Sequence, residues 1–323
     1  MAVLGAAAAV ELVPVRARAQ ASRTLRVAVP PSEDAAAIHF ADEMGFLAKA
    51  GLAVDIQTMQ NNPAIAAAVA SGAVDIGHGG VDTLAASHSK GIPLRVIAPS
   101  GEYVSTQMQR GAGLFVPAAS PVRVARDLNG KIAAVAGLHG LTMTATCAWI
   151  DTNGGDSSTM RFIEVAFPSM AAALASGRVD AAFITEPFLD DALKSGRALA
   201  YGFDSIARHF LVAAWFANTS WIQANPDAVA RFSQAMHETA LWANRHPDQS
   251  AAIFVKFTKM DPAVIAKMVR GHYAEQMTPA LMQPLIDASA KYNGFAAFPA
   301  QELMATSARS AAVGGARRRF VPT

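Results

Sequence analysis

Two stretches of this chain are almost the same: residues 66–75 read AAAVASGAVD, and residues 171–180 read AAALASGRVD. They differ only at the fourth and eighth positions. Alanine bias can explain the first half of the match, but it does not explain the shared Ser-Gly-x-Val-Asp. That pattern predicts a helix that ends at a glycine, Gly72 or Gly177, because glycine adopts the left-handed conformation after a helix without strain. A strand then follows two residues later.

The match extends upstream with the same offset, since residues 26–29 (RVAV) align with residues 131–134 (KIAA). We therefore predict two copies of a βαβαβ unit, near residues 25–98 and 131–184. Strands that alternate with helices indicate parallel sheets. One copy in each domain gives an α/β protein of two similar βαβ lobes.

The first copy can be divided further by its turn residues and its hydrophobic periodicity. Alternating and β-branched runs predict strands at residues 25–29, 54–59, 74–76 and 94–98. The segments between them predict helices at residues 35–50, 61–71 and 82–90. Gly79 and Gly80 are expected to form the turn after the third strand.

The sequence outside the two copies predicts how the lobes are joined. Residues 99–130 are rich in glycine and proline and suggest a linker into the second lobe, and residues 209–216 suggest a second extended stretch. Helical periodicity begins at Asn225. In the simplest topology, residues 209–217 return to the first lobe and the C-terminal helices pack on its flank. The chain then crosses between the lobes twice, and these two segments form a hinge beside a shared cleft. The expected boundaries are lobe 1 at residues 22–106 plus 214–323, and lobe 2 at residues 107–213.

The N-terminus predicts a signal peptide over residues 1–21. Residues 1–15 are apolar apart from Glu11, and overlapping A-x-A triplets follow at residues 17–19 and 19–21. The apolar part is too short for a membrane anchor, and no cysteine near the junction indicates lipidation. A basic n-region is missing, so we expect the true translation start to lie upstream of Met1. The alternative is that this N-terminal segment forms an Ala-rich helix of the mature protein. We predict a periplasmic protein that is not lipid-anchored.

Composition excludes several classes of protein. Hydrophobic residues make up 52% and charged residues 16%, which is too apolar for a disordered chain. The formal net charge is +2, and the only basic run, beginning at Arg317, is read as a solvated tail, so no nucleic-acid partner is expected. Cys147 is the sole cysteine, which excludes an intramolecular disulfide, a cysteine zinc cluster and a CxxC pair.

Four motifs carry a family resemblance: PPSED at residues 30–34, SGAVDIGHGG at residues 71–80, AGLHG at residues 136–140 and TEPF at residues 185–188. In this order the chain resembles the nitrate/sulfonate/taurine-type solute-binding proteins of ABC importers, whose relatives bind thiamine precursors. The resemblance covers about residues 24–300. It implies a type II periplasmic-binding-protein fold, a Venus-flytrap motion, and a monomer that delivers a small molecule to an inner-membrane permease and its ATPase.

The binding site can be placed from the sheet geometry. Ligands of parallel sheets bind outside the carboxyl ends of the strands, so the loop after each strand should face the cleft. Helix N-termini there offer unpaired N–H groups and positive potential. The candidate ligand-binding residues are Ser32, Glu33, Asp34, His39, Asn61, His78, Gly79, Gly80, Gly137, Leu138, His139, Thr142, Thr185 and Glu186.

Each candidate also has a structural alternative. The glycines can be simple turns, His139, Glu33 and Asp34 can cap helices, and His78 can satisfy nearby backbone. Glu186 precedes a proline, which places it at a helix start where a carboxylate is favourable. Trp215 is either core or a wall of the cleft.

Catalysis is the rival function. The sequence contains no G-x-S-x-G, P-loop or HExxH motif, and its histidines lack metal-ligand spacing, so we expect no enzyme, metal or cofactor. A related pyrimidine-synthase enzyme carries a cysteine-rich motif, from which the single Cys147 departs.

The cleft loops contain Asp82, Glu102 and other acidic residues but hardly any Arg or Lys. The scarcity of Arg and Lys slightly favours a neutral or amine-bearing ligand, because an oxyanion site is expected to contain a guanidinium group. The ligand itself is left unidentified.

Overall fold

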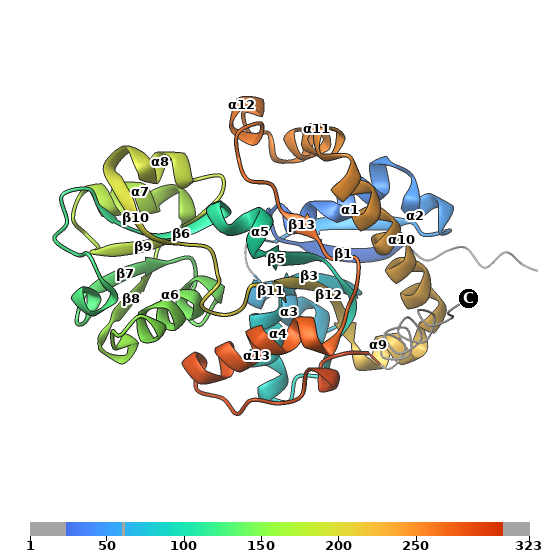
Figure 1. Cartoon of the computed structure of the whole chain (residues 1–323). Helices are drawn as coiled ribbons and strands as arrows, with labels where there is room; N and C mark the ends of the chain where they lie inside the picture. Colours follow the sequence, from blue (N-terminus) through green and yellow to red (C-terminus); the bar gives the residue numbers. More distant parts are fainter. Residues whose placement is uncertain (1–23, 60–61, 306–323) are drawn as a thin grey trace, which may run out of the picture.

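The computed structural model describes residues 24–59 and 62–305, and in it the chain forms two similar five-stranded sheets (Figure 1). The first sheet has the strand order β2-β1-β3-β12-β4. Its strands are β1 (Leu25–Val29), β2 (Val54–Thr58), β3 (Ile76–Gly80), β4 (Leu94–Pro99) and β12 (Ala213–Asn218). The strand β1 is parallel to β2 and β3, whereas β12 is antiparallel to both of its neighbours.

The second sheet repeats this arrangement with the order β8-β7-β9-β6-β10. Its strands are β6 (Ala112–Pro117), β7 (Ile132–Val135), β8 (Arg161–Glu164), β9 (Ala181–Thr185) and β10 (Gly196–Tyr201). Here β7 is parallel to β8 and β9, and β6 is the antiparallel strand. The two predicted βαβαβ copies are therefore confirmed. In each sheet the antiparallel strand comes from outside the copy, and β12 returns from the second half of the chain to the first sheet.

The helices that cover the sheets follow the predicted pattern with one break. They are α1 (Ala37–Glu43), α2 (Phe46–Lys49), α3 (Asn62–Ala70), α4 (Val81–Ser89), α6 (Leu141–Thr152), α7 (Phe167–Ala175) and α8 (Leu189–Ser195). The helix predicted at residues 35–50 is divided into a 3-10 turn, α1 and α2. Gly45 adopts a left-handed φ of 73° between α1 and α2, a conformation that ends the first helix and that glycine adopts without strain.

The turn predicted at Gly79 and Gly80 is wrong, because both residues belong to β3. They pair with Ala214 and Ala213 of β12, a partner that lies far away in the sequence. A Cβ atom on the preceding Gly77 would lie 2.6 Å from Cζ of Phe216. A glycine is needed at residue 77 because the aromatic ring of β12 packs directly on the β3 backbone.

The hinge contains more regular structure than the predicted linker. Residues 99–130 include β5 (Gly101–Val104), α5 (Ser105–Met108) and β6. The second extended stretch is divided into β11 (His209–Leu211) and β12. A three-stranded sheet of order β11-β5-β13, completed by β13 (His272–Tyr273), therefore joins the two halves, with the crossing strands antiparallel. The exact lobe boundaries stay a prediction.

The C-terminal helices are α9 (Thr219–Ala224), α10 (Pro226–Arg245), α11 (Pro247–Thr258), α12 (Pro262–Ile265) and α13 (Pro279–Asn293). The helix α10 packs on α1 and on β4, and α13 packs on both α4 and α6, so that it touches both halves (Figure 1). Trp215 is fully buried against Phe232 of α10, so it belongs to the core and does not wall the cleft.

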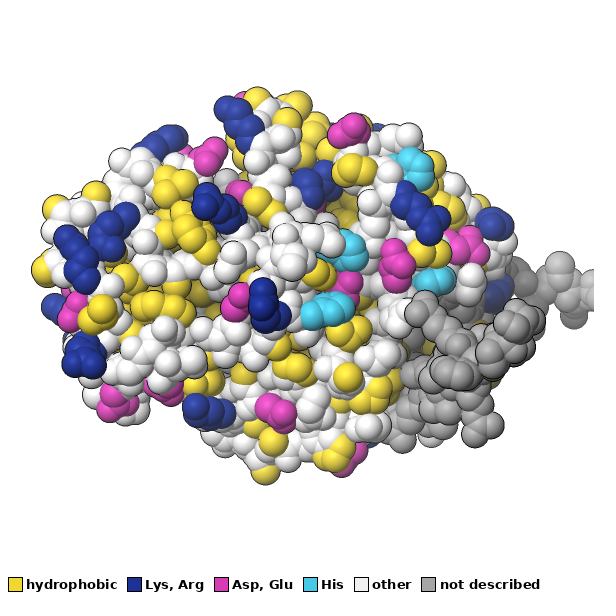
Figure 2. All heavy atoms as spheres, in the orientation of Figure 1, with side chains coloured by type: hydrophobic (Ala, Val, Ile, Leu, Met, Phe, Trp, Pro, Cys, Tyr) yellow, Lys and Arg dark blue, Asp and Glu magenta, His cyan; other side chains and the backbone are white. Residues whose placement is uncertain are grey.

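Three sequence predictions fall outside the described residues: the signal peptide at 1–21, Asn61, and the basic run at Arg317. None of the helices in the described ranges is long and apolar enough to cross a membrane. On the face shown in Figure 2, Lys and Arg side chains are dispersed among acidic and hydrophobic ones and do not form one stripe.

Candidate functional site

The carboxyl ends of β1, β3 and β4 bring several candidate side chains together. His78 Nε2 lies 3.0 Å from Ser100 Oγ and 3.8 Å from Asp34 Oδ2. The Ser100 hydroxyl donates to the Asp34 carbonyl at 2.9 Å, and Ser32 donates to the Asp34 carboxylate. Burial lowers the pKa of His78, and the Asp34 charge opposes this effect. The structure thus groups three predicted residues, Ser32, Asp34 and His78, and adds Ser100, which the sequence analysis missed.

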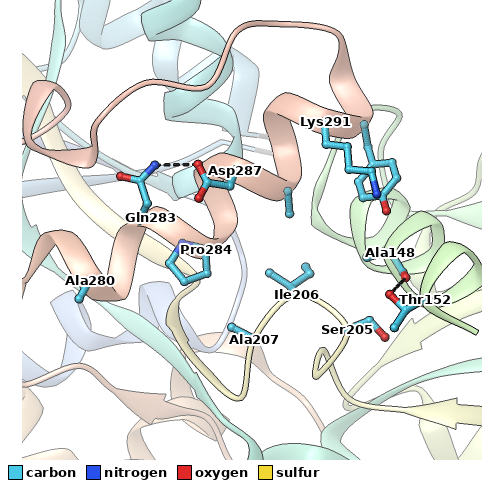
Figure 3. Close-up of a pocket in the computed structure, with 12 residues that line it drawn as sticks. Ala148, Thr152, Ser205, Ile206, Ala207, Ala280, Gln283, Pro284, Asp287 and Lys291 are labelled. Atoms are coloured by element: carbon cyan, nitrogen blue, oxygen red, sulfur yellow. Dashed lines mark hydrogen bonds between the residues drawn. The ribbon is translucent and has the colours of Figure 1, made fainter.

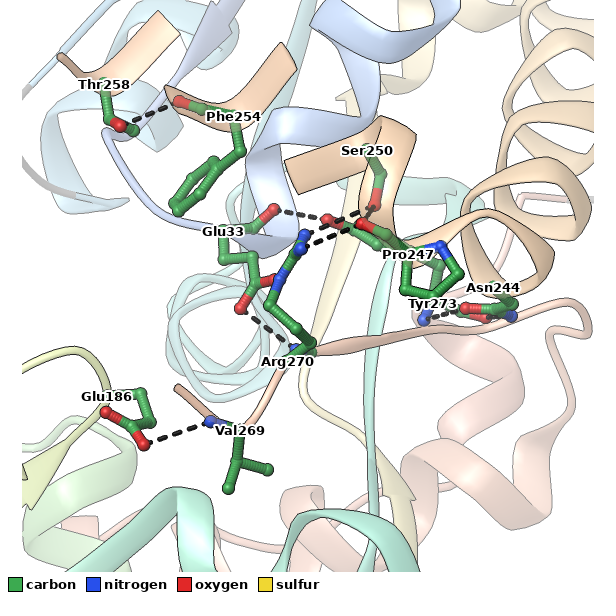
Figure 4. A network of polar contacts seen from close by, with 11 residues as sticks. Glu33, Glu186, Asn244, Pro247, Ser250, Phe254, Thr258, Val269, Arg270 and Tyr273 are labelled. Atoms are coloured by element: carbon green, nitrogen blue, oxygen red, sulfur yellow. Dashed lines mark hydrogen bonds and ion pairs between the residues drawn. The ribbon is translucent and has the colours of Figure 1, made fainter. Parts of the chain in front are cut away.

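Glu33 faces a different partner that the sequence analysis also missed, Arg270 (Figure 4). Its carboxylate forms an ion pair with the Arg270 guanidinium and accepts the Gly271 N–H at 3.0 Å. The Tyr273 hydroxyl donates to the Glu33 carbonyl at 2.9 Å. Burial raises the pKa of Glu33, although the nearby Arg270 charge acts in the opposite direction. Glu33 makes no side-chain capping bond to the 3-10 turn that follows it.

Residues 266–272, which we call the strap, connect both halves of the molecule. The Val269 N–H donates to Glu186 Oε1 at 3.1 Å (Figure 4). The Val269 side chain also lies 3.3 Å from where a Cβ on Gly111 would stand. Burial raises the pKa of Glu186, with smaller contributions from the Asp190 and Glu33 charges. Glu186 is not in a first helical turn as predicted, because α8 begins only at Leu189.

The loop before α6 and the first turn of that helix carry four of the other candidates. His139 has a left-handed φ of 65°, and its carbonyl accepts the Asn293 side-chain amide of α13 at 2.9 Å. The α6 N-cap is Gly140 and has no side-chain cap, so His139 is not the cap. Thr142 Oγ1 accepts the Ala136 N–H at 3.1 Å. Gly137 has open space around it, and Leu138 is 48% exposed.

Asp82 lies at the start of α4 and faces the start of α6 in the other half. Its carboxylate lies beside the start of α6, where a Cβ on Gly140 would stand 3.8 Å from Oδ2, and the N–H groups of Thr83 and of Leu141, the first residue of α6, oppose the effect of burial on its pKa. The residue is 5% exposed, and burial raises its pKa above the usual range for aspartate. A Cβ atom on Gly80 would stand 2.1 Å from Asp82 Oδ1. The space beside Gly80 is therefore occupied by this carboxylate.

The remaining candidates do not join one cluster. His39 stacks on Phe257 of α11 with ring centroids 3.8 Å apart, and burial lowers its pKa. Gly79 is a paired residue of β3, and the Thr185 hydroxyl donates to the Glu186 carbonyl at 3.3 Å.

A separate groove of about 530 Å³ lies between α13, α6 and residues 205–207 (Figure 3). Gln283 and Asp287 of α13 form one side of it, and Thr152 of α6 lies on the other. None of the candidate binding residues lines this groove. It lies at the junction of the two halves, away from the strand ends that carry Asp34 and Asp82.

The hinge sheet contains a buried carboxylate between two histidines. Glu102 of β5 accepts from His209 Nε2 of β11 at 2.8 Å and from His272 Nδ1 of β13 at 2.9 Å. Burial works against ionisation of Glu102, but the hydrogen bonds from His272 and His209 outweigh it and hold the pKa below its usual value. The crossing strands are thus held together through one charged group.

We expect Glu102→Gln to lower the free energy of unfolding at pH 7 by about 1.5–3 kcal/mol, the range for hydrogen bonds to charged groups. A lowered folded-state pKa contributes stability above the unfolded pKa, and this contribution is lost as the pH falls through the folded pKa. The difference between the variant and the wild type should therefore be smaller at pH 3 than at pH 7. Urea denaturation at both pH values measures it, and an equal loss at the two pH values would contradict this origin.

A family model described as NMT1/THI5 like matches residues 32–250. One relative, from Brucella abortus (strain 2308), is provisionally named as a binding protein and is 25% identical to this chain. The match spans 236 residues and covers 69% of this chain and 67% of that protein.

Solved structures share the fold. The periplasmic aliphatic sulphonate binding protein SsuA from Escherichia coli matches with a TM-score of 0.71 at 17% identity, covering 88% of this chain and 92% of that one. The periplasmic nitrate-binding protein NrtA from Synechocystis PCC 6803 matches with a TM-score of 0.73 at 14% identity, over 91% and 89% of the two chains. The predicted type II periplasmic-binding-protein fold is confirmed.

The desulfurization enzyme DszB has this fold too, with a TM-score of 0.64 at 14% identity over 91% of this chain and 99% of that one. The fold alone therefore does not separate binding from catalysis. The family model covers more than half of the chain, so the chain belongs to the NMT1/THI5-like family.

Proposed function

We propose that this protein is the extracytoplasmic solute-binding component of an ABC importer, which captures a small polar molecule between its lobes and delivers it to a permease and its ATPase. The observation that carries the proposal is that polar groups from both halves meet at the strand ends. Asp82 reaches Leu141 of α6, and Glu186 reaches Val269 of the strap. Relatives with the same fold are named as sulphonate-binding and nitrate-binding proteins.

The hinge supports a closing motion. Two crossing strands, β5 and β11, connect the halves, and rotation about such a pair can open or close the cleft while each sheet stays rigid. A ligand that touches both halves favours the closed state by the difference in its affinity for the two states. The strap contributes because it contacts Glu33 on one side and Glu186 on the other.

The only cysteine supports binding over a cysteine-dependent reaction. Cys147 lies within α6 and is 4% exposed, and burial raises the pKa of its thiol to about 11. The thiolate is the reactive form of cysteine, so this thiol is a poor nucleophile at neutral pH. We propose a periplasmic, monomeric protein without a lipid anchor.

Ligand screening by thermal shift tests the proposal, with pyrimidines, amines, aromatic acids, sulfonates and nitrate as probes. A genuine ligand at 100 times its dissociation constant should add about 2.7 kcal/mol of stability. Small-angle scattering with that ligand at saturation should show a smaller radius of gyration, because both lobes close on it. Tight binding with an unchanged radius would contradict closure, and turnover of the bound compound would contradict a pure binding role.

A further inference from the structure

On the basis of the proposed function, we infer that Asp82 determines the ligand class. Its carboxylate occupies the start of α6, where an anionic ligand would bind. The site therefore accepts molecules that carry hydrogen-bond donors or positive charge, and it rejects oxyanions such as nitrate, sulfate and sulfonates.

The first step is the position of Asp82 between the two halves. It stands in the first turn of α4, directly after β3 of the first sheet. Its carboxylate lies beside Gly140, the N-cap of α6, which follows β7 of the second sheet. The crevice outside the carboxyl ends of parallel strands is where such folds bind ligands. The carboxylate therefore lies where the strand ends of the two halves meet.

The second step is the electrostatics of α6. A helix N-terminus carries unpaired N–H groups and partial positive charge, and it binds an anion if none is supplied by the chain. The α6 sequence supplies none, because its N-cap is Gly140 and makes no side-chain bond. Asp82 provides the missing anion from the other half. Because it is only 5% exposed, water screens it poorly, and a second anion close by is repelled strongly.

The third step is the space around the carboxylate. A Cβ on Gly80 would stand 2.1 Å from Oδ1, and a Cβ on Gly140 would stand 3.8 Å from Oδ2. Any side chain at Gly80 would displace the carboxylate, and Gly140 lies beside it. The Asp82 carboxylate thus occupies the space beside these two glycines, and an oxyanion cannot bind there.

The strand that precedes Asp82 also carries a buried ring nitrogen without a partner, on His78. The Ser100 hydroxyl gives its proton to the Asp34 carbonyl, so in the His78–Ser100 hydrogen bond His78 Nε2 is the donor. The neutral His78 ring then has an acceptor at Nδ1, and this atom is buried without a partner in a side chain that is 1% exposed. An unpaired buried acceptor is satisfied by an N–H or O–H group and not by an oxyanion.

The test uses the full chain and isothermal titration with sodium sulfate, sodium nitrate and ethanesulfonate. We expect the wild type to bind these oxyanions at least about 100-fold more weakly than Asp82→Ala, because the N–H groups at α6 become available to the probe in the variant. Asp82→Asn keeps the shape and removes the charge, so it should show a smaller gain. It also serves as the test if the alanine variant does not fold. Asp55→Ala, an exposed position on β2 with the same change in net charge, should match the wild type.

Wild-type binding of any of these oxyanions as tight as that of Asp82→Ala would overturn the inference, as would the absence of a gain in both folded Asp82 variants. The proposed function is judged separately, by whether the wild type binds any compound of the ligand screen. If it binds none while Asp82→Ala still gains sulfate affinity, the importer role fails and the role of Asp82 stands. If the wild type binds an amine-bearing compound and Asp82→Asn weakens it, both stand.

Discussion

Replacing Arg270 by methionine should lower the free energy of unfolding by about 3–5 kcal/mol at pH 8, because removal of one partner leaves a buried charge on Glu33. The Arg270 and Glu33 side chains are only 19% and 14% exposed, so solvent cannot take over the lost interaction. The guanidinium also donates to the Pro247 carbonyl at 3.2 Å and lies over the Phe254 ring. Chemical denaturation of the two proteins gives the difference.

The sign of the pH dependence distinguishes this origin from simple loss of packing. The pKa of Glu33 is already raised in the wild type, and loss of Arg270 raises it further. A raised pKa contributes stability below the unfolded value that is lost as the pH rises through the folded value. The cost of Arg270→Met should therefore be smaller at pH 4 than at pH 8.

Two further variants complete the test of this ion pair. The double variant Glu33→Gln with Arg270→Met should regain much of the loss, since no buried charge remains. Lys256→Met, which removes an exposed ion pair with Glu43, should cost less than about 1 kcal/mol. A double variant that is no more stable than Arg270→Met alone would show that the ion pair is not the cause.

Trp215→Ala is expected to lower the free energy of unfolding by about 3–5 kcal/mol, the range for removing a large aromatic side chain from a core. Trp215 is completely buried in β12, with ring centroids 5.5 Å from Phe232 and 4.8 Å from His78. Ligand affinity should fall as well, because His78 packs on this indole. Thermal denaturation and binding of the screened ligand measure the two effects.

Trp215→Phe is the matched control. It keeps an aromatic ring in the core and removes the indole N–H, which is buried without a hydrogen-bond partner. Removing an unsatisfied donor offsets part of the lost packing, so the cost should stay below about 1.5 kcal/mol. Equal losses in the phenylalanine and alanine variants would mean that the packing of the ring does not account for the stability.

Part of the candidate site follows from the sequence because it depends on local order along the chain. The loops after the strands could be placed once the repeat was found, and three of the residues in them, Ser32, Asp34 and His78, come together. Ser100 and Arg270 could not be found in this way. Ser100 follows β4, and Arg270 lies in the strap between α12 and β13, where no periodic pattern or motif marks it. The presence of an arginine beside Glu33 also corrects the impression of a cleft without guanidinium groups.

By itself, the sequence determined the two βαβαβ units, the α/β class and the return of the chain to the first sheet. These follow from hydrophobic periodicity and from glycines that end helices, which are local properties. Only the tertiary structure decided that Gly79 and Gly80 lie in a strand and that Asp82 lies beside the start of a helix of the other half. Both depend on partners, β12 and α6, that are far away in the sequence. Pairing and contacts between such segments are set by packing of the whole chain, which no local pattern records.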